Sequence, residues 1–215
     1  MTRRFVLLGS ALVLALTLPL TAQAETKGFY IGAGVGADFA VDSAATAAAG
    51  RNTVRYDAGP SGLVTVGYGF GAFRTELEGA YRTNDVSGTG GALLGNVGGS
   101  ARTWSLMVNG LYDINTGTPF TPYLGAGVGV GFVNASLSGT RPAGSPTGLY
   151  NGSDTTFAYQ AIAGVSYAVT PRLSLTADYR YVATTDASFN SGGASWNVEN
   201  ANHVLTAGFR WTLGN

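Results

Sequence analysis

Few residues of this chain could perform chemistry on a substrate. The sequence has no cysteine and a single histidine, His203. Covalent catalysis needs a nucleophile held beside a partner base, and the residues around His203 offer no clear partner. A metal site needs several ligands, whereas the acidic residues are spread along the chain. We therefore expect no catalytic residues, no metal site and no bound cofactor.

Two other patterns could suggest chemistry, but a structural role explains each of them better. Glycines occupy alternate positions over 32–36 and 125–131. A phosphate-binding loop requires a helix after its glycines, and no helical pattern follows either run. Glu76 and Glu78 could form an acid–base pair, but they alternate with arginines in the same stretch. Because a buried charge is costly unless it is paired, we expect these carboxylates to form ion pairs.

The elements that would position these side chains are β-strands. From Phe120 to Phe132 every second residue is apolar, and the residues between them are Thr121, Tyr123 and four glycines. A period of two indicates a strand with one apolar face and one nearly bare face. Such a strand fits the wall of a membrane barrel, where apolar side chains meet lipid and glycines leave room in a narrow lumen.

The stretch 73–83 has the same period, with charged residues on one face. Its other face carries Phe73, Leu77 and Tyr81 and matches the apolar faces of the neighbouring stretches, so the charged face is predicted to line the lumen. Two later strands add charges to the same interior. The predicted lumen network, expected to hold the barrel together and to plug it, consists of Arg74, Glu76, Glu78, Arg82, Asp178, Arg180 and Arg210.

Eight alternating stretches occur in the chain: 28–39, 62–70, 73–83, 102–114, 120–134, 155–169, 172–182 and 202–213. Short connections (71–72, 115–119 and 170–171) alternate with long ones (41–59, 84–101, 135–153 and 183–201). An even number of strands, short periplasmic turns and long extracellular loops are typical of outer-membrane barrels. The sequence predicts an all-β fold, an eight-stranded antiparallel up-and-down transmembrane β-barrel whose polar lumen is filled by side chains.

Aromatic residues fall near both ends of these strands, as expected for girdles at the two membrane interfaces. The predicted girdle at the short-turn end consists of Phe29, Phe70, Phe73, Tyr112, Phe120, Tyr167 and Trp211. The predicted girdle at the long-loop end consists of Phe39, Tyr81, Trp104, Phe132, Phe157 and Tyr181.

The first 24 residues have the pattern of a secretory signal peptide. Two arginines precede an apolar run from Phe5 to Leu20, and Ala22-Gln23-Ala24 fits a cleavage site. We therefore expect a signal peptide over 1–24 and one barrel domain over 25–215. The formal net charge is zero, so nothing suggests nucleic acid as a partner.

Four stretches resemble the small outer-membrane β-barrel proteins of Gram-negative bacteria, which include OmpA-like transmembrane domains, opacity proteins and surface antigens of the porin family. They are GFYIGAGVG (28–36), PFTPYLGAGVGVGF (119–132), VSYAVTPRLSLTADYRYV (165–182) and NHVLTAGFRWTL (202–213). The resemblance implies a non-enzymatic protein of the cell outer membrane with both termini in the periplasm. Its role would be envelope integrity, adhesion through the loops or display as a surface antigen. Such chains usually end on an aromatic residue, whereas this one ends on Asn215.

The same resemblance implies the partners. They are the lipids and lipopolysaccharide of the outer membrane, the barrel assembly machinery and an unidentified extracellular ligand at the loops, and the barrel is expected to be a monomer. Three alternatives remain. One is a narrow porin-like channel for small solutes, and another is a lipid A-modifying enzyme that uses His203, since similar lipid-modifying barrels use a His/Ser pair. The third is a soluble ligand-binding barrel such as a lipocalin, whose lumen should be apolar.

Overall fold

The structure is a computed structural model that describes residues 26–41, 43–47, 50–90, 97–140, 146–191 and 194–213. The predicted signal peptide, 1–24, lies outside these residues. The strands are β1 (Thr26–Ala40), β2 (Ser43–Ala47), β3 (Gly50–Tyr56), β4 (Gly59–Gly71), β5 (Phe73–Gly90), β6 (Val97–Asp113), β7 (Phe120–Thr140), β8 (Pro146–Ala168), β9 (Leu173–Ser191) and β10 (Ala194–Thr212). Within the described ranges, no helix is long and apolar enough to cross a membrane.

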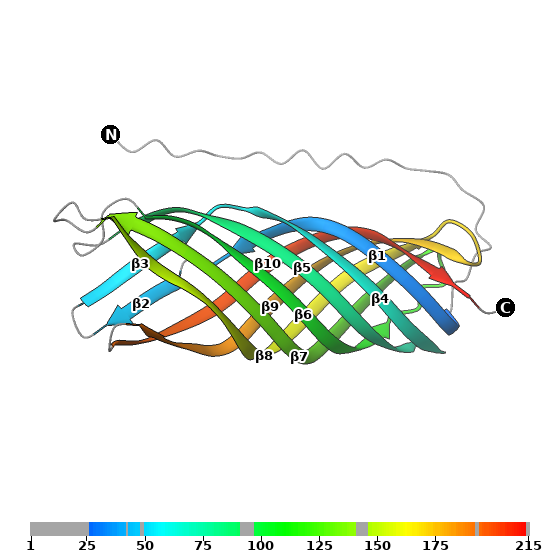
Figure 1. The fold of residues 1–215 in the computed structure, drawn as a ribbon. Helices are drawn as coiled ribbons and strands as arrows, with labels where there is room; N and C mark the ends of the chain where they lie inside the picture. Colours follow the sequence, from blue (N-terminus) through cyan, green and yellow to red (C-terminus); the bar gives the residue numbers. More distant parts are fainter. Residues whose placement is uncertain are drawn as a thin grey trace, which may run out of the picture.

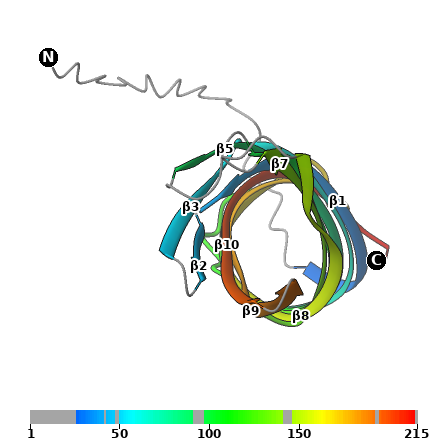
Figure 2. The same cartoon turned by 60° about the vertical axis from the view of Figure 1, so that its left-hand side comes forward.

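The strands close into one barrel (Figures 1 and 2). Going around the wall, the order is β1, β4, β5, β6, β7, β8, β9 and β10, and β10 pairs with β1 again. The closing pair runs from Tyr30 opposite Thr212 to Ala40 opposite Asn202. All neighbouring strands are antiparallel. The eight-stranded antiparallel barrel predicted from the sequence is confirmed.

The two ends of the barrel differ in their connections. At the short-turn end, Ala72 alone separates β4 from β5, and 114–119 and 169–172 join the next two pairs, as predicted. At the opposite end, the long-hairpin end, β7 reaches Thr140 and β8 begins at Pro146. The predicted loops 84–101, 135–153 and 183–201 are therefore largely strand, because backbone pairing continues beyond the apolar alternation.

Two barrel strands are interrupted near the long-hairpin end. β1 pairs with β10 as far as Ala40, and β2 resumes this pairing where Thr46 lies opposite Asn197. In the same way, β4 and β3 both pair with β5. β1 and β2 together form the first barrel strand, and β3 and β4 form the second. The prediction of a loop over 41–59 is wrong for 43–47 and 50–56, which form strands without an apolar alternation.

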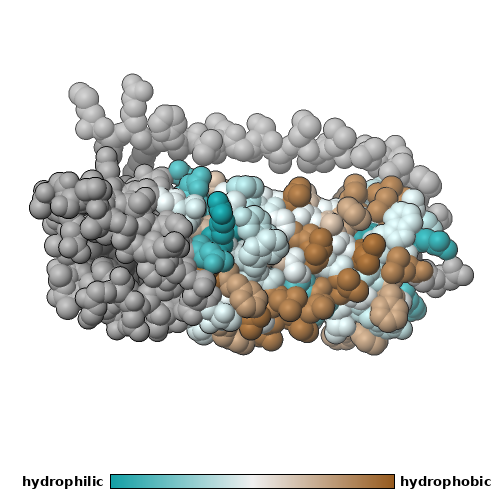
Figure 3. All heavy atoms as spheres, in the orientation of Figure 1, coloured by the Kyte–Doolittle hydropathy of each residue, from teal (hydrophilic) through white to brown (hydrophobic). Residues whose placement is uncertain are grey.

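Side chains alternate between the lumen and the outer wall. Val128 and Val130, predicted to face lipid, are 53% and 37% exposed, whereas Arg74 and Glu78 are 2% and 1% exposed. Figure 3 shows apolar side chains, in brown, gathered over the described part of the wall. The buried side chains are mostly polar, so the core of this molecule lies inside the lumen. A water-soluble barrel such as a lipocalin would have the opposite arrangement, and this alternative is rejected.

Glycines on the inner face make room for two buried tyrosine rings. A Cβ atom built on Gly67 would lie 2.4 Å from Cζ of Tyr30, and one built on Gly164 would lie 2.5 Å from Cζ of Tyr123. Both distances are far below van der Waals contact. The nearly bare strand faces seen in the sequence are thus filled by side chains from neighbouring strands.

Candidate functional site

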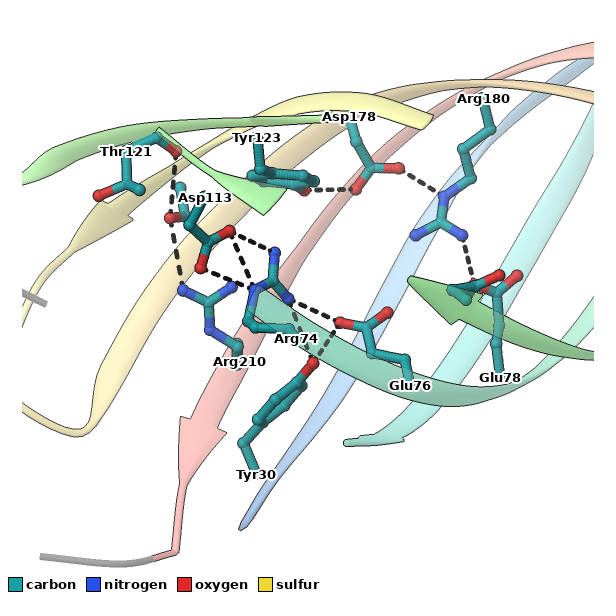
Figure 4. A network of polar contacts seen from close by, with 12 residues as sticks. Tyr30, Arg74, Glu76, Glu78, Asp113, Thr121, Tyr123, Asp178, Arg180 and Arg210 are labelled. Carbon is teal, nitrogen blue, oxygen red and sulfur yellow. Dashed lines mark hydrogen bonds and ion pairs between the residues drawn. The ribbon is translucent and has the colours of Figure 1, made fainter. Parts of the chain in front are cut away.

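The first group of lumen charges is centred on Arg74 of β5 (Figure 4). Its guanidinium donates to both carboxylate oxygens of Asp113 on β6, with Nε–Oδ2 at 2.8 Å and Nη2–Oδ1 at 2.9 Å. Nη1 of Arg74 also lies 2.8 Å from Oε1 of Glu76. The hydroxyl of Tyr30 on β1 donates to the same Glu76 oxygen at 2.8 Å. This Arg74 cluster connects three barrel strands through charge-assisted hydrogen bonds.

The second group is centred on Arg180 of β9. Its Nε donates to Oδ1 of Asp178 at 2.5 Å, and its Nη1 forms an ion pair with Glu78 of β5. Glu78 also accepts a hydrogen bond from Nδ2 of Asn109 at 2.8 Å, and the hydroxyl of Tyr123 donates to Asp178 at 3.1 Å. The partners of this Arg180 cluster thus come from β5, β6, β7 and β9.

Two predicted members of the network lie beside these clusters without joining an ion pair. Nη2 of Arg82 donates to the hydroxyl of Ser105 at 3.1 Å, and Nη2 of Arg210 donates to that of Ser166 at 3.4 Å. Within the part of the chain that the structure describes, neither arginine has a carboxylate within 4.0 Å. The guanidinium of Arg210 lies over the ring of Tyr30 at 5.8 Å.

Sequence reasoning missed several residues of both clusters. They include Asp113, Tyr30, Asn109, Tyr123 and Gln160, whose Nε2 donates to Asn109 at 2.7 Å. Each stands at an inward position of its strand, so the period of two places them in the lumen but does not assign them to a cluster. Their partners could not be named. Asp113 and Asn109 bond to the preceding strand, β5, in a register that a local pattern does not encode, and Tyr30, Tyr123 and Gln160 bond to strands that are not consecutive in the sequence.

Little free space lies between the two clusters. A cavity of about 30 Å³ lies between the two clusters and is lined by Arg74, Glu76, Asp178, Arg180 and other residues. A water molecule needs a cavity of at least about 10–15 Å³. The cavity therefore has room for a few water molecules at most. No group of three His, Cys, Asp or Glu side chains suited to a metal ion occurs in the described ranges.

The predicted aromatic girdle residues all lie on the outer wall, exposed or half-exposed. Neighbouring strands bring several of them into contact. At the short-turn end, the ring centroids of Phe73 and Tyr112 are 4.9 Å apart. Towards the long-hairpin end, those of Tyr81 and Trp104 are 4.6 Å apart. This spacing lies within the range of favourable aromatic pairs.

His203 also lies on the outer wall, towards the long-hairpin end of β10. Its Nδ1 and the hydroxyl of Tyr179 are 2.6 Å apart, and its ring centroid lies 5.5 Å from that of Tyr181. No serine of the described residues is hydrogen-bonded to it. A His/Ser pair is therefore not formed here.

Comparison with known proteins identifies relatives along most of the chain. Residues 8–211 match the family described as "Outer membrane protein beta-barrel domain". An outer membrane protein of Gluconacetobacter diazotrophicus is 33% identical over 180 residues, which cover 74% of this chain and 48% of that protein. Major surface antigen 4 of Anaplasma marginale is 30% identical over 146 residues, covering 58% of this chain and 47% of the antigen. The chain thus spans about half the length of these relatives.

Among solved structures, the outer membrane protein OprG from Pseudomonas aeruginosa has a similar fold. The TM-score is 0.59 with 16% sequence identity, and the alignment covers 88% of this chain and 98% of OprG. At this identity the likeness concerns the fold alone.

Proposed function

Because the chain belongs to the outer membrane protein beta-barrel family, we propose that it is a structural and surface protein of the bacterial outer membrane that performs no catalysis. The protein is a small outer-membrane barrel with relatives among surface antigens. In the proposed role, the barrel supports the integrity of the envelope. Its long hairpins are presented for adhesion or recognition at the cell surface.

The observation that carries this proposal is the closed lumen. Arg74 and Arg180 are 2% and 6% exposed, and each is paired with two carboxylates. Breaking a buried ion pair leaves an uncompensated charge and is strongly destabilising. The clusters therefore favour a structural interior over a transport path or a reaction site.

The proposed orientation places the short-turn end in the periplasm and the long-hairpin end outside the cell. Short periplasmic turns and long extracellular connections are the rule for such barrels. β1 begins and β10 ends at the short-turn end, where Tyr30 lies opposite Thr212. The start of β1 and the end of β10 would therefore both face the periplasm. The outer wall would contact membrane lipids and lipopolysaccharide as a monomer, and the long hairpins would meet an extracellular ligand.

Cysteine labelling tests this orientation, because the natural chain has no cysteine. Two single variants are compared: Ser145→Cys, between β7 and β8, and Thr116→Cys, between β6 and β7. In intact cells, a membrane-impermeant maleimide should label Ser145→Cys and leave Thr116→Cys unlabelled. Both should react after the outer membrane is permeabilised, which serves as the control. Labelling of Thr116→Cys alone in intact cells would refute the orientation and with it the surface role.

A further inference from the structure

An open apolar groove crosses the outer wall over β8, β9, β10 and β1. The space above it measures about 480 Å³ and is widely open to the surroundings of the wall. Its floor is formed by Ala177 of β9 and Ala207 of β10, which lie opposite each other in the sheet. Val35 and Val165 continue the same row on the two flanking strands.

Bulky side chains border this row along the outer face. Towards the long-hairpin end, Leu205 and Tyr179 lie opposite each other, and on the other side Phe209 lies opposite Leu175. All four are 41–53% exposed and stand out from the wall. Two alanines between these larger pairs leave a trough in the outer wall.

A polar pair stands at the border of the groove that faces the long-hairpin end. Tyr179 lines the groove, and its hydroxyl is 2.6 Å from Nδ1 of His203. His203 lies two residues from Leu205 on the same outer face of β10. In either neutral tautomer, the bond to Tyr179 occupies Nδ1 and leaves Nε2 to find another partner. Among the described residues, no hydrogen bond to Nε2 is formed.

An imidazole on a lipid-facing wall is costly unless its second nitrogen is hydrogen-bonded. His203 lies opposite Phe39 and against Tyr181, two residues of the predicted girdle at the membrane interface. The partners available there are water and the oxygen atoms of lipids, whose esters, hydroxyls and phosphates are mainly acceptors. With the tyrosine hydroxyl donating to Nδ1, the Nε2–H of His203 is a donor that fits such an oxygen. The groove beneath it would hold the attached acyl chain.

We propose that this groove, with His203 and Tyr179 at its border, binds one acyl chain of an outer-leaflet glycolipid of the lipid A class. Hydrocarbon tails and apolar side chains are equally apolar, so binding depends on shape and on the polar contact. The choice of the outer leaflet rests on the orientation proposed above, which places His203 towards the cell surface.

Native mass spectrometry of the intact barrel, purified in mild detergent, tests the site. Lipid A and phosphatidylethanolamine are added at equal concentration, and retained lipids are counted. The natural protein should retain one lipid A and prefer it over phosphatidylethanolamine by about tenfold, equivalent to about 1.4 kcal/mol. Ala207→Phe, which fills the floor, and His203→Phe, which removes the donor but keeps a ring, should each reduce this retention by about tenfold.

Thr75→Phe is the matched control for added bulk. Thr75 is exposed on the outer face of β5, the strand diametrically opposite β9 in the barrel order. The Thr75→Phe variant should retain lipid A as the natural protein does. Equal retention in the natural protein, Ala207→Phe and Thr75→Phe would overturn the groove, and equal retention of both lipids would overturn the glycolipid assignment. Heat-dependent gel mobility verifies that each variant is folded.

The outcome is separable from that of the proposed orientation. Lipid retention is measured on the purified barrel and depends on the groove alone, whereas cysteine labelling reports which end faces outward. A reversed labelling pattern with intact lipid A retention would refute the surface orientation and keep the groove. Normal labelling without lipid A retention would refute the groove only.

Discussion

At the scale of single residues, Arg74 makes the most consequential contacts. It pairs with Asp113 and Glu76, and its guanidinium also lies within 6 Å of two tyrosine rings. Arginine suits this position because its planar fork can donate to two carboxylates at once. Lysine could not reproduce these contacts.

Arg74→Met is expected to lower the free energy of unfolding by about 3–5 kcal/mol, because Asp113 and Glu76 would remain as buried charges without their partner. Urea unfolding of the barrel in lipid vesicles, followed by tryptophan fluorescence, measures this loss. The control is Arg102→Met, at an exposed position of β6, which should change stability by no more than about 0.5 kcal/mol. A similar small change for Arg74→Met would contradict the assigned role of the cluster.

Sequence reasoning could place charges in the lumen but could not pair them. Alternation along 73–83 puts Arg74, Glu76 and Glu78 on one face whatever the rest of the fold. Whether Glu78 meets Arg82 or Arg180 depends on strand tilt and register, which a local pattern does not encode. Arg180 meets Glu78, whereas Arg82 lies against Ser105.

At the scale of elements, side-chain hydrogen bonds hold the chain together where the first two barrel strands are interrupted. Nδ2 of Asn202 donates to both carboxylate oxygens of Asp38 at 2.8 Å. Nδ2 of Asn84 lies 3.3 Å from the carbonyl oxygen of Asp38 and 3.4 Å from that of Asp57. Asn84 thus joins the end of β1 to the residue that follows β3.

Asn84→Ala should loosen this junction locally, since it removes the donor to two carbonyl groups. Hydrogen exchange is expected to accelerate at the amides of Val41 and Asp57, which bond to Ala201 and Asp85. The amide of Val128, in the middle of β7, serves as the internal reference and should exchange at its original rate. Faster exchange at all three amides would mean that the variant weakens the whole barrel instead.

The sequence predicted these elements unevenly, for a physical reason. Where a strand crosses lipid, its outer side chains must be apolar, and the alternation is plain, as over 120–132. Beyond the lipid, either face can be polar, and the stretches 43–47 (SAATA) and 50–56 (GRNTVRY) carry no such period. Their backbone hydrogen bonds form nonetheless.

At the scale of the whole molecule, the closed barrel with paired interior charges is expected not to conduct ions. The cavity of about 30 Å³ between the clusters is small, and an eight-stranded barrel has little interior beyond its own side chains. Purified protein in planar lipid bilayers should give no single-channel current steps. A large porin reconstituted in parallel controls for insertion, and regular steps from this protein would instead support the narrow-channel alternative.

The barrel formed by the described residues was predictable, because outer-membrane barrels obey strict structural rules. A membrane barrel needs an even set of alternating strands, two aromatic girdles and a regular order of connections, and all of these can be read in one sequence. A binding partner of the long hairpins leaves no comparable pattern. The groove over Ala177 and Ala207 was also invisible, because which residues of β9 and β10 lie opposite each other depends on strand register.

The ion pair between Arg180 and Glu78 links strands that face each other across the barrel. Backbone ladders join only adjacent strands, so by themselves they allow a ring of eight to flatten into an ellipse. A tie across the diameter resists that deformation. The shape of the cross-section should therefore persist when lateral pressure in the surrounding leaflets changes.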